Sequence, residues 1–199
     1  MTALPAKPMP TPTQAASPTA RYVATARAVA ALLWAIAFLA VVHGRLVPVR
    51  SDIPLSAGLL LAAYPLIDAV ASLVERQKLR AQAYAARVID TLAVAGLLIA
   101  TLTLHAGSVL IAFGTWAFAS GLLQLLHAWR AVTPRRAQLP LIFSGAISAI
   151  AGITFAAMAA QRTAHLANLG GYAILGAFFF LIWTVLNRRS RAVAGLDAW

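Results

Sequence analysis

Six long apolar runs divide this chain, and they constrain its fold more than any other feature. The runs span approximately residues 23–43, 55–75, 85–104, 107–128, 139–160 and 167–187. Each is close to the ~20 residues that an α-helix needs to cross about 30 Å of hydrocarbon. Strands of a transmembrane barrel would alternate polar and apolar residues, whereas these runs are continuously apolar and rich in Ala and Leu. The sequence therefore predicts an all-α membrane protein with six transmembrane helices.

The composition favours a membrane protein over a soluble domain. Of the 199 residues, 61% are hydrophobic and only 11% are charged, whereas charged residues make up about a quarter of a soluble domain. The net charge of +11 raises the alternative of nucleic-acid binding. Because the basic residues lie between apolar runs, we predict instead that they contact anionic lipid head groups, with no nucleic-acid partner.

The ends of the chain differ in composition from its apolar middle. Residues 1–20 contain five Pro and many small polar residues, which cannot bury enough apolar area to offset the entropy of ordering. They predict a disordered cytoplasmic tail rather than a cleaved signal peptide. We expect a transmembrane domain over residues 21–190 and a short cytoplasmic C-terminal tail over residues 191–199.

The positions of the basic residues predict the orientation of the helices. Thirteen of the 16 Lys and Arg precede or open the first run, or follow the second, fourth and sixth runs. Arg45, Arg50 and Arg162 occupy the alternate loops. Cytoplasmic loops carry an excess of Lys and Arg, so both termini are predicted in the cytoplasm. The six helices would form three hairpins, over about residues 23–75, 85–128 and 139–187.

The even-numbered runs show an internal similarity. When Tyr64, Trp116 and Tyr172 are aligned, small residues precede each aromatic residue, and small or polar residues follow it four and five positions later: Asp68 and Ala69, Ser120 and Gly121, Gly176 and Ala177. The spacings suggest a two-helix unit used three times. Coincidence in a chain rich in Ala and Gly is the alternative.

The similarity extends to a known family in four segments: GTWAFASGLLQLLHAWR, LIFSGAISAIAGITF, LGGYAILGAFFFLIWTVLNRR and LLLAAYPLIDAVASLVERQ. They resemble the HdeD-like family of bacterial acid-resistance membrane proteins, which are small six-helix proteins with three hairpins. The resemblance covers roughly residues 25–190, and the first helix departs from it, with Arg27-Ala28 where the family often has Arg-Gly. It implies a multi-pass protein of the bacterial inner membrane with a role in stress, and it carries over no catalytic residue.

Two acidic residues, Asp68 and Asp90, fall inside the predicted helices. Charged side chains in a membrane are rare and usually functional or paired. Both should lie in the cytoplasmic half, where they could share a proton or bind a cation across a hairpin. In the structural alternative, Asp90 pairs with Arg87 or Arg27 and ties helices together.

Other residues invite weaker hypotheses. Pro65 is a candidate kink in the second helix, and Gln124 and His127, one turn apart on one face, are candidates for interhelical hydrogen bonds. His43, His105 and His165 fall at outer helix ends, where interface positions compete with pH sensing or metal binding. Small residues allow helices to approach closely, and they are frequent in the last two helices, at Gly145, Ser148, Gly152, Gly170, Gly171 and Gly176.

No phosphate loop, serine elbow, zinc helix or cysteine occurs in the sequence. We therefore predict no catalytic residue, metal site or cofactor. The leading hypothesis is a non-enzymatic membrane protein that acts through helix packing, lipids or a partner, with a homo-oligomer left open. The alternatives are a small-solute or proton transporter or channel that uses Asp68 and Asp90 and, with less support, a membrane-embedded enzyme.

Overall fold

The computed structural model describes residues 17–74, 80–102, 105–130 and 135–196. Six helices and two short strands occur in this part of the chain: α1 (Pro18–Val42), β1 (Leu46–Pro48), α2 (Leu55–Val74), α3 (Arg80–Leu102), α4 (Ala106–Arg130), α5 (Arg135–Met158), β2 (Thr163–His165) and α6 (Ala167–Leu196). The prediction of a helical fold is confirmed. Strands were not predicted in the loops.

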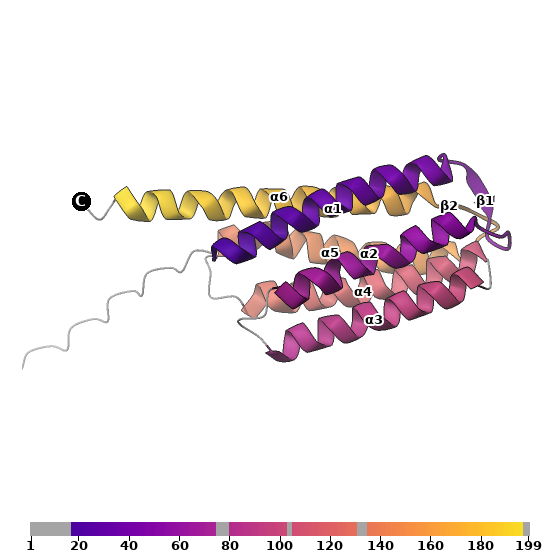
Figure 1. Cartoon of the computed structure of the whole chain (residues 1–199), viewed down its shortest axis with the longest axis horizontal. Coiled ribbons are helices and arrows are strands. Elements are labelled where there is room, and N and C mark those ends of the chain that lie inside the picture. Colours follow the sequence, from indigo (N-terminus) through magenta and orange to yellow (C-terminus); the bar gives the residue numbers. More distant parts are fainter. Residues whose placement is uncertain (1–16, 75–79, 103–104, 131–134, 197–199) are drawn as a thin grey trace, which may run out of the picture.

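The six helices form an elongated bundle in which the chain runs up and down (Figure 1). Each helix packs against the helices that precede and follow it, and α6 packs against α1, so the bundle is a closed ring. The closest packing is between α4 and α5, followed by α1 with α6 and α2 with α3. The predicted hairpin partners are therefore neighbours, but the tightest contacts join one predicted hairpin to the next.

Both terminal helices extend beyond the predicted runs. The first helix begins at Pro18 rather than near residue 23, because the Ser17 side chain caps it by accepting a hydrogen bond from the Ala20 amide at 3.1 Å. The prediction of a disordered tail otherwise falls on residues 1–16, outside the described residues. At the other end, α6 continues through most of the predicted C-terminal tail, to Leu196.

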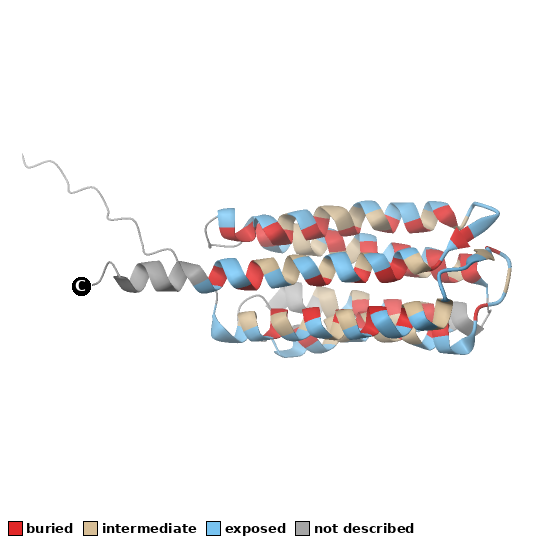
Figure 2. Cartoon of the chain, turned by 90° about the horizontal axis from the view of Figure 1, so that it is seen from above, coloured by how far each residue is buried: buried red, intermediate tan, exposed pale blue. Residues whose placement is uncertain are grey.

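Four helices are long and apolar enough to cross a bilayer: α1, α4, α5 and the Ala167–Arg188 part of α6. The apolar part of α2, Leu55–Ala71, is shorter, and α3 contains Arg80, Arg87 and Asp90. These features are consistent with a membrane protein. Buried and exposed positions alternate along every helix (Figure 2), and each helix exposes large apolar side chains, among them Leu33, Leu66, Leu92, Ile111, Ile150 and Phe178.

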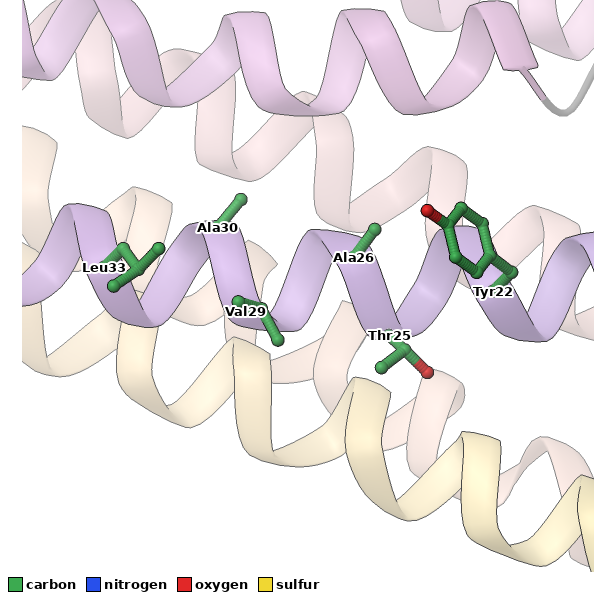
Figure 3. A pocket seen from close by; sticks show the side chains of 6 residues that line it. All are labelled: Tyr22, Thr25, Ala26, Val29, Ala30 and Leu33. Carbon is green, nitrogen blue, oxygen red and sulfur yellow. The ribbon is translucent and has the colours of Figure 1, made fainter.

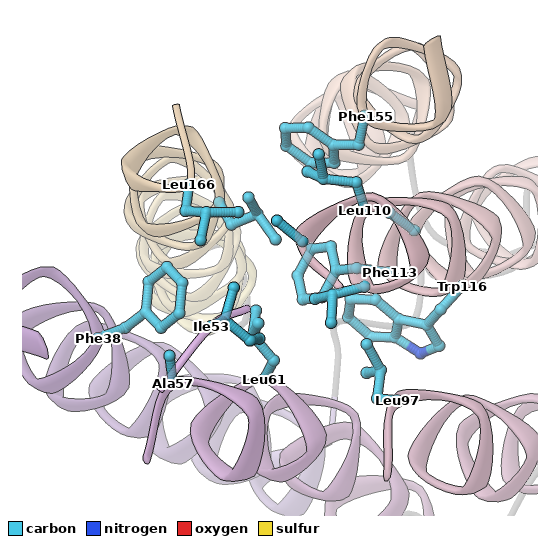
Figure 4. Packing of buried hydrophobic residues seen from close by; sticks show 14 of the residues in the cluster. Phe38, Ile53, Ala57, Leu61, Leu97, Leu110, Phe113, Trp116, Phe155 and Leu166 are labelled. Carbon is cyan, nitrogen blue, oxygen red and sulfur yellow. The ribbon is translucent and has the colours of Figure 1, made fainter. Parts of the chain in front are cut away.

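Aromatic and aliphatic side chains fill the centre of the ring (Figure 4). Phe38, Leu61, Leu110, Phe113 and Leu169 are completely buried. They belong to α1, α2, α4 and α6, so the largest core cluster joins helices from opposite sides of the bundle. The bundle is consequently filled by side chains over the half that lies towards the two strands.

A cap, made of residues 43–54, 105–107 and 159–166, covers the end of the bundle opposite to the start of α1 and the end of α6 (Figure 1). Strand β1 pairs antiparallel with β2, with Leu46 opposite His165, and the Val49 amide donates to the Arg162 carbonyl at 3.1 Å. These bonds satisfy backbone groups that a simple polar turn would leave to solvent. The sequence suggested turns here because neither segment is long enough to show strand periodicity.

The first loop of the cap also binds the link between α3 and α4. The amide of Ala106 donates to the Ser51 carbonyl at 3.1 Å, and that of Gly107 donates to the Val49 carbonyl at 2.9 Å. Asp52 and His105 form a β-bridge, and their side chains lie 3.6 Å apart. The three loops at this end are therefore one connected unit.

The contact between α4 and α5 depends on glycines that face each other in pairs. A Cβ atom added at Gly152 would lie 2.5 Å from the Gly114 carbonyl oxygen, and one added at Gly114 would lie 2.6 Å from the Gly152 oxygen. Gly121 and Gly145 repeat this reciprocal contact two turns away, at 2.6 and 2.9 Å. The two backbones touch, which explains why α4 and α5 pack most closely in the ring.

Candidate functional site

An ion pair between α1 and α2 is the most unusual polar feature inside the bundle. Nη2 of Arg27 lies 2.7 Å from Oδ1 of Asp68, and the two side chains are 21% and 26% exposed. The guanidinium of Arg27 also lies over the ring of Phe180 on α6, 4.5 Å from its centroid. Arg27 therefore contacts both neighbours of α1 in the ring.

Asp90 has a different environment from Asp68. It is 3% exposed, and its Oδ1 accepts a hydrogen bond of 2.9 Å from the indole Nε1 of Trp116. This bond joins α3 to α4. Asp90 and Asp68, the two acidic residues that the sequence singled out, influence each other electrostatically, but each is bonded to another residue. The sequence suggested Arg27 as a partner of Asp90, and the structure shows it bonded to Asp68.

The three aromatic residues aligned in the sequence meet at the centre of the ring. The ring of Tyr64 lies 5.4 Å from that of Trp116 and 6.3 Å from that of Tyr172, in both cases edge to face. Phe113 contacts all three, at centroid distances of 5.2 to 6.0 Å. These residues come from α2, α4 and α6, so the even-numbered helices point equivalent side chains at one another.

A third polar contact joins α5 to α6, where the Ser148 Oγ lies 3.1 Å from the Tyr172 hydroxyl. Each predicted hairpin thus contains an interhelical polar contact: Arg27 with Asp68, Asp90 with Trp116, and Ser148 with Tyr172. We call this set the polar layer. It binds helices to one another across the bundle, whereas the half towards the cap is filled by apolar side chains such as Phe38 and Leu110.

Pro65 lies inside a continuous α2 and is fully buried. Proline cannot donate to the carbonyl four residues earlier, which loosens the preceding turn. In that turn the indole Nε1 of Trp34 donates to the Leu60 carbonyl. A side chain of α1 therefore bonds a carbonyl of α2 near the proline, one residue before the Leu61 carbonyl that Pro65 leaves without its amide donor.

Gln124 and His127 differ although they lie one turn apart. The amide of Gln124 donates to the Leu141 carbonyl at 3.1 Å and so joins α4 to α5, whereas the side chain of His127 is exposed. The remaining histidines belong to the cap: His43 ends α1 in a left-handed conformation with φ 49°, and His105 and His165 lie in the bridged segments. No group of three His, Asp or Glu able to hold a metal ion occurs among the described residues.

Sequence reasoning singled out Asp68, Asp90 and the three aligned aromatic residues, but it missed two partners in the polar layer. Arg27 was considered for Asp90 rather than Asp68, and Trp116 was recognised as an aromatic residue rather than as a donor. The rotation of each helix about its axis decides such pairings, and apolar runs without an amphipathic pattern do not specify it. No protein-family model, curated protein or solved structure matches the chain.

Proposed function

We propose that the chain is an integral protein of the bacterial inner membrane and that it crosses the membrane six times. Support comes from the distribution of side chains: all six helices, α2 and α3 included, expose large apolar residues, such as Leu66 and Leu92, whereas Asp90 and Asn187 are buried. A soluble bundle needs the reverse arrangement. In a bilayer, polar groups are expected to face the bundle interior and pair there.

The proposed orientation places both ends of the chain in the cytoplasm and the cap outside. The cap contains Arg45, Arg50 and Arg162. At the opposite end of the bundle, Arg21, Arg80 and Arg135 lie at the start of α1, α3 and α5, and Arg130 lies at the end of α4. The start of α1 and the end of α6 lie at that same opposite side (Figure 1). This asymmetry follows the excess of Lys and Arg found in cytoplasmic loops.

The proposal includes three repeated two-helix units. Two observations support it. Each unit has an interhelical polar contact in the polar layer. In two of the units, the small residue five positions after the aligned aromatic residue packs against the next unit: Gly121 contacts Gly145, and Ala177 clusters with Ala28 and Ala31. Three such units, with α6 of the last unit packed on α1 of the first, would explain why closer contacts between units alternate around the ring with looser contacts within units.

For activity, we propose a non-enzymatic role that is exerted through packing, lipids or a partner. The observation that carries this proposal is that Asp68 is bonded directly to Arg27. The half of the core that lies between this ion pair and the cap is filled by apolar side chains. A transport path would need hydrated polar groups along the membrane normal, whereas the polar layer runs from helix to helix. The resemblance to the HdeD-like family adds a role in acid or envelope stress.

One observation favours the alternative of proton or solute transport. The side chains of Arg27 and Asp68 keep about a quarter of their surface exposed, and Asp90 interacts electrostatically with Asp68. A carboxylate that water can reach is able to take up and release a proton. The alternative therefore predicts that Asp68 is needed for proton movement, whereas the leading proposal needs it only for stability.

The two proposals are separated by measuring proton uptake in vesicles that contain the purified chain. Wild type, Asp68→Asn and, as a matched control in the cap, Asp52→Asn are compared at equal protein content. We expect all three to match empty vesicles. Uptake by wild type that Asp68→Asn alone abolishes would establish transport and overturn the leading proposal.

The stress role is tested by survival in acid of cells with and without the gene. We expect survival to fall without the chain and to be restored by wild type and, at matched protein level, by Asp68→Asn. Unchanged survival without the chain would contradict the stress role.

A further inference from the structure

A shallow hollow lies on the outward face of α1 (Figure 3). It has a volume of about 340 Å³ and is lined by Tyr22, Thr25, Ala26, Val29, Ala30 and Leu33. The small side chains of Ala26 and Ala30 leave the space, and Tyr22 and Leu33 stand at its two ends. A linear, mainly apolar molecule would fit along the helix there.

The length and position of the hollow match one lipid chain. From Tyr22 to Leu33 the helix rises about 16 Å, at 1.5 Å per residue, and half of a bilayer's hydrocarbon is about 15 Å thick. The hollow starts within the first turns of α1 and ends near the middle of the bundle. In the proposed orientation it therefore spans the cytoplasmic leaflet.

Charge at the first turn of α1 indicates the type of lipid. Arg21 directly precedes the hollow. Its backbone carbonyl accepts a hydrogen bond of 2.9 Å from the hydroxyl of Thr25, and Thr25 is one of the residues that line the hollow. The Nε of Arg21 is buried and has no hydrogen-bond partner among the described residues. Because Nε is buried, a ligand outside the bundle would meet the Nη atoms of the guanidinium, for which a phosphate oxygen is a strong acceptor.

We propose that the hollow binds one acyl chain of an anionic phospholipid of the cytoplasmic leaflet, whose phosphate accepts hydrogen bonds from Arg21. The proposal rests on the membrane location and orientation given above. Tyr22, which is 75% exposed, lies at the level of the head group, where tyrosine side chains concentrate in membrane proteins.

The test measures lipid retained by the protein after extraction from mixed vesicles of phosphatidylglycerol and phosphatidylcholine. The double variant Ala26→Leu/Ala30→Leu fills the hollow. Ala40→Leu, an exposed position on α1 outside the hollow, adds the same side chain as a control. We expect wild type and Ala40→Leu to retain phosphatidylglycerol and the double variant to retain about tenfold less, because the two leucine side chains occupy the space of the acyl chain.

Arg21→Gln tests the head group. We expect it to lose the preference for phosphatidylglycerol over phosphatidylcholine, whereas Arg45→Gln in the cap keeps it. Equal lipid retention in wild type and the double variant would overturn the proposal. So would a change from dimer to monomer in the double variant, which would assign the hollow to a second copy of the chain.

Flotation of the protein with the vesicles separates this proposal from the one on which it rests. Wild type that floats but retains no phosphatidylglycerol contradicts only the lipid site. Wild type that does not float contradicts the membrane location as well.

Discussion

The α4/α5 and α1/α2 contacts hold neighbouring helices together in different ways. Between α4 and α5, Gly114 and Gly152 bring the two backbones into direct contact. Between α1 and α2, the helices are joined by the ion pair of Arg27 with Asp68 and by the bond from Trp34 to the Leu60 carbonyl. One contact depends on the absence of side chains and the other on particular side chains.

This difference determines what each contact tolerates. In lipid, apolar side chains gain little by leaving the solvent, so helices associate through close packing and polar bonds. A glycine contact has no room for any added atom. A polar contact can be replaced by a well-packed apolar pair, provided that both partners change together. The free energy of unfolding in a mild detergent distinguishes the two kinds of contact.

The largest effect is expected from Gly152→Leu. A Cβ atom there would lie 2.5 Å from both the Gly114 carbonyl oxygen and the Phe118 amide nitrogen, and neither backbone can yield without separating α4 from α5. We expect a loss of about 3 kcal/mol or more. Gly171→Leu is the control, since nothing lies within 4 Å of its Cβ position, and it should be neutral or stabilising. Equal losses in the two variants would show that the backbone contact is unimportant.

The next effect is expected from Asp68→Asn, which leaves Arg27 without its carboxylate. Loss of one partner of a buried pair costs about 3–5 kcal/mol, and we expect about 2 kcal/mol here because both side chains are partly exposed. The double variant Arg27→Met/Asp68→Leu should recover most of that loss. If the double variant is less stable than the single one, the pair contributes more than an apolar replacement can, and the distinction between the two contacts fails.

A smaller effect is expected at the contact of Ser148 with Tyr172. Interhelical hydrogen bonds in membrane proteins average about 0.6 kcal/mol, so Ser148→Ala and Tyr172→Phe should each cost about that amount. A double-mutant cycle isolates the bond from changes in packing. A coupling energy near zero would indicate that the 3.1 Å contact contributes nothing to holding α5 on α6.

The smallest effect is expected from Asp90→Asn. The asparagine oxygen can still accept the hydrogen bond from Trp116, so the free energy of unfolding should change by less than about 0.5 kcal/mol. The comparison with Asp68→Asn is the informative one, because Asp68 is bonded to the Arg27 guanidinium, whereas the hydrogen-bond donor to Asp90 is the neutral indole of Trp116. A loss at Asp90 as large as that at Asp68 would mean that the Asp90 charge itself is used.

The sequence predicted the helices better than their contacts. Continuous apolar runs specify a helix through length alone, which is why all six were found. Gly145 and Gly152 were recognised as positions of close approach, but their partners Gly121 and Gly114 lie on another helix and only the fold identifies them. Gly171 was grouped with them, although it faces open space.

The candidate site shows the same limit. An acidic residue in an apolar run stands out in any sequence, so Asp68 and Asp90 could be named. The bond of Arg27 to Asp68 depends on the rotation of α1 and α2 about their axes and could not be predicted. Neither the cap nor its strands had a signal, because β1 and β2 contain three residues each and gain their backbone partners only when distant loops meet.

The central claim is that the cap lies outside the cell and the opposite end of the bundle in the cytoplasm. Labelling of single cysteines in intact cells tests it most directly, because the chain has no cysteine of its own. Arg162→Cys lies exposed in the cap, and Arg136→Cys lies exposed at the opposite end of the bundle. A reagent that does not cross membranes should label position 162 in intact cells and position 136 only after the cells are opened. Labelling of position 136 from outside, or protection of position 162, would contradict the account.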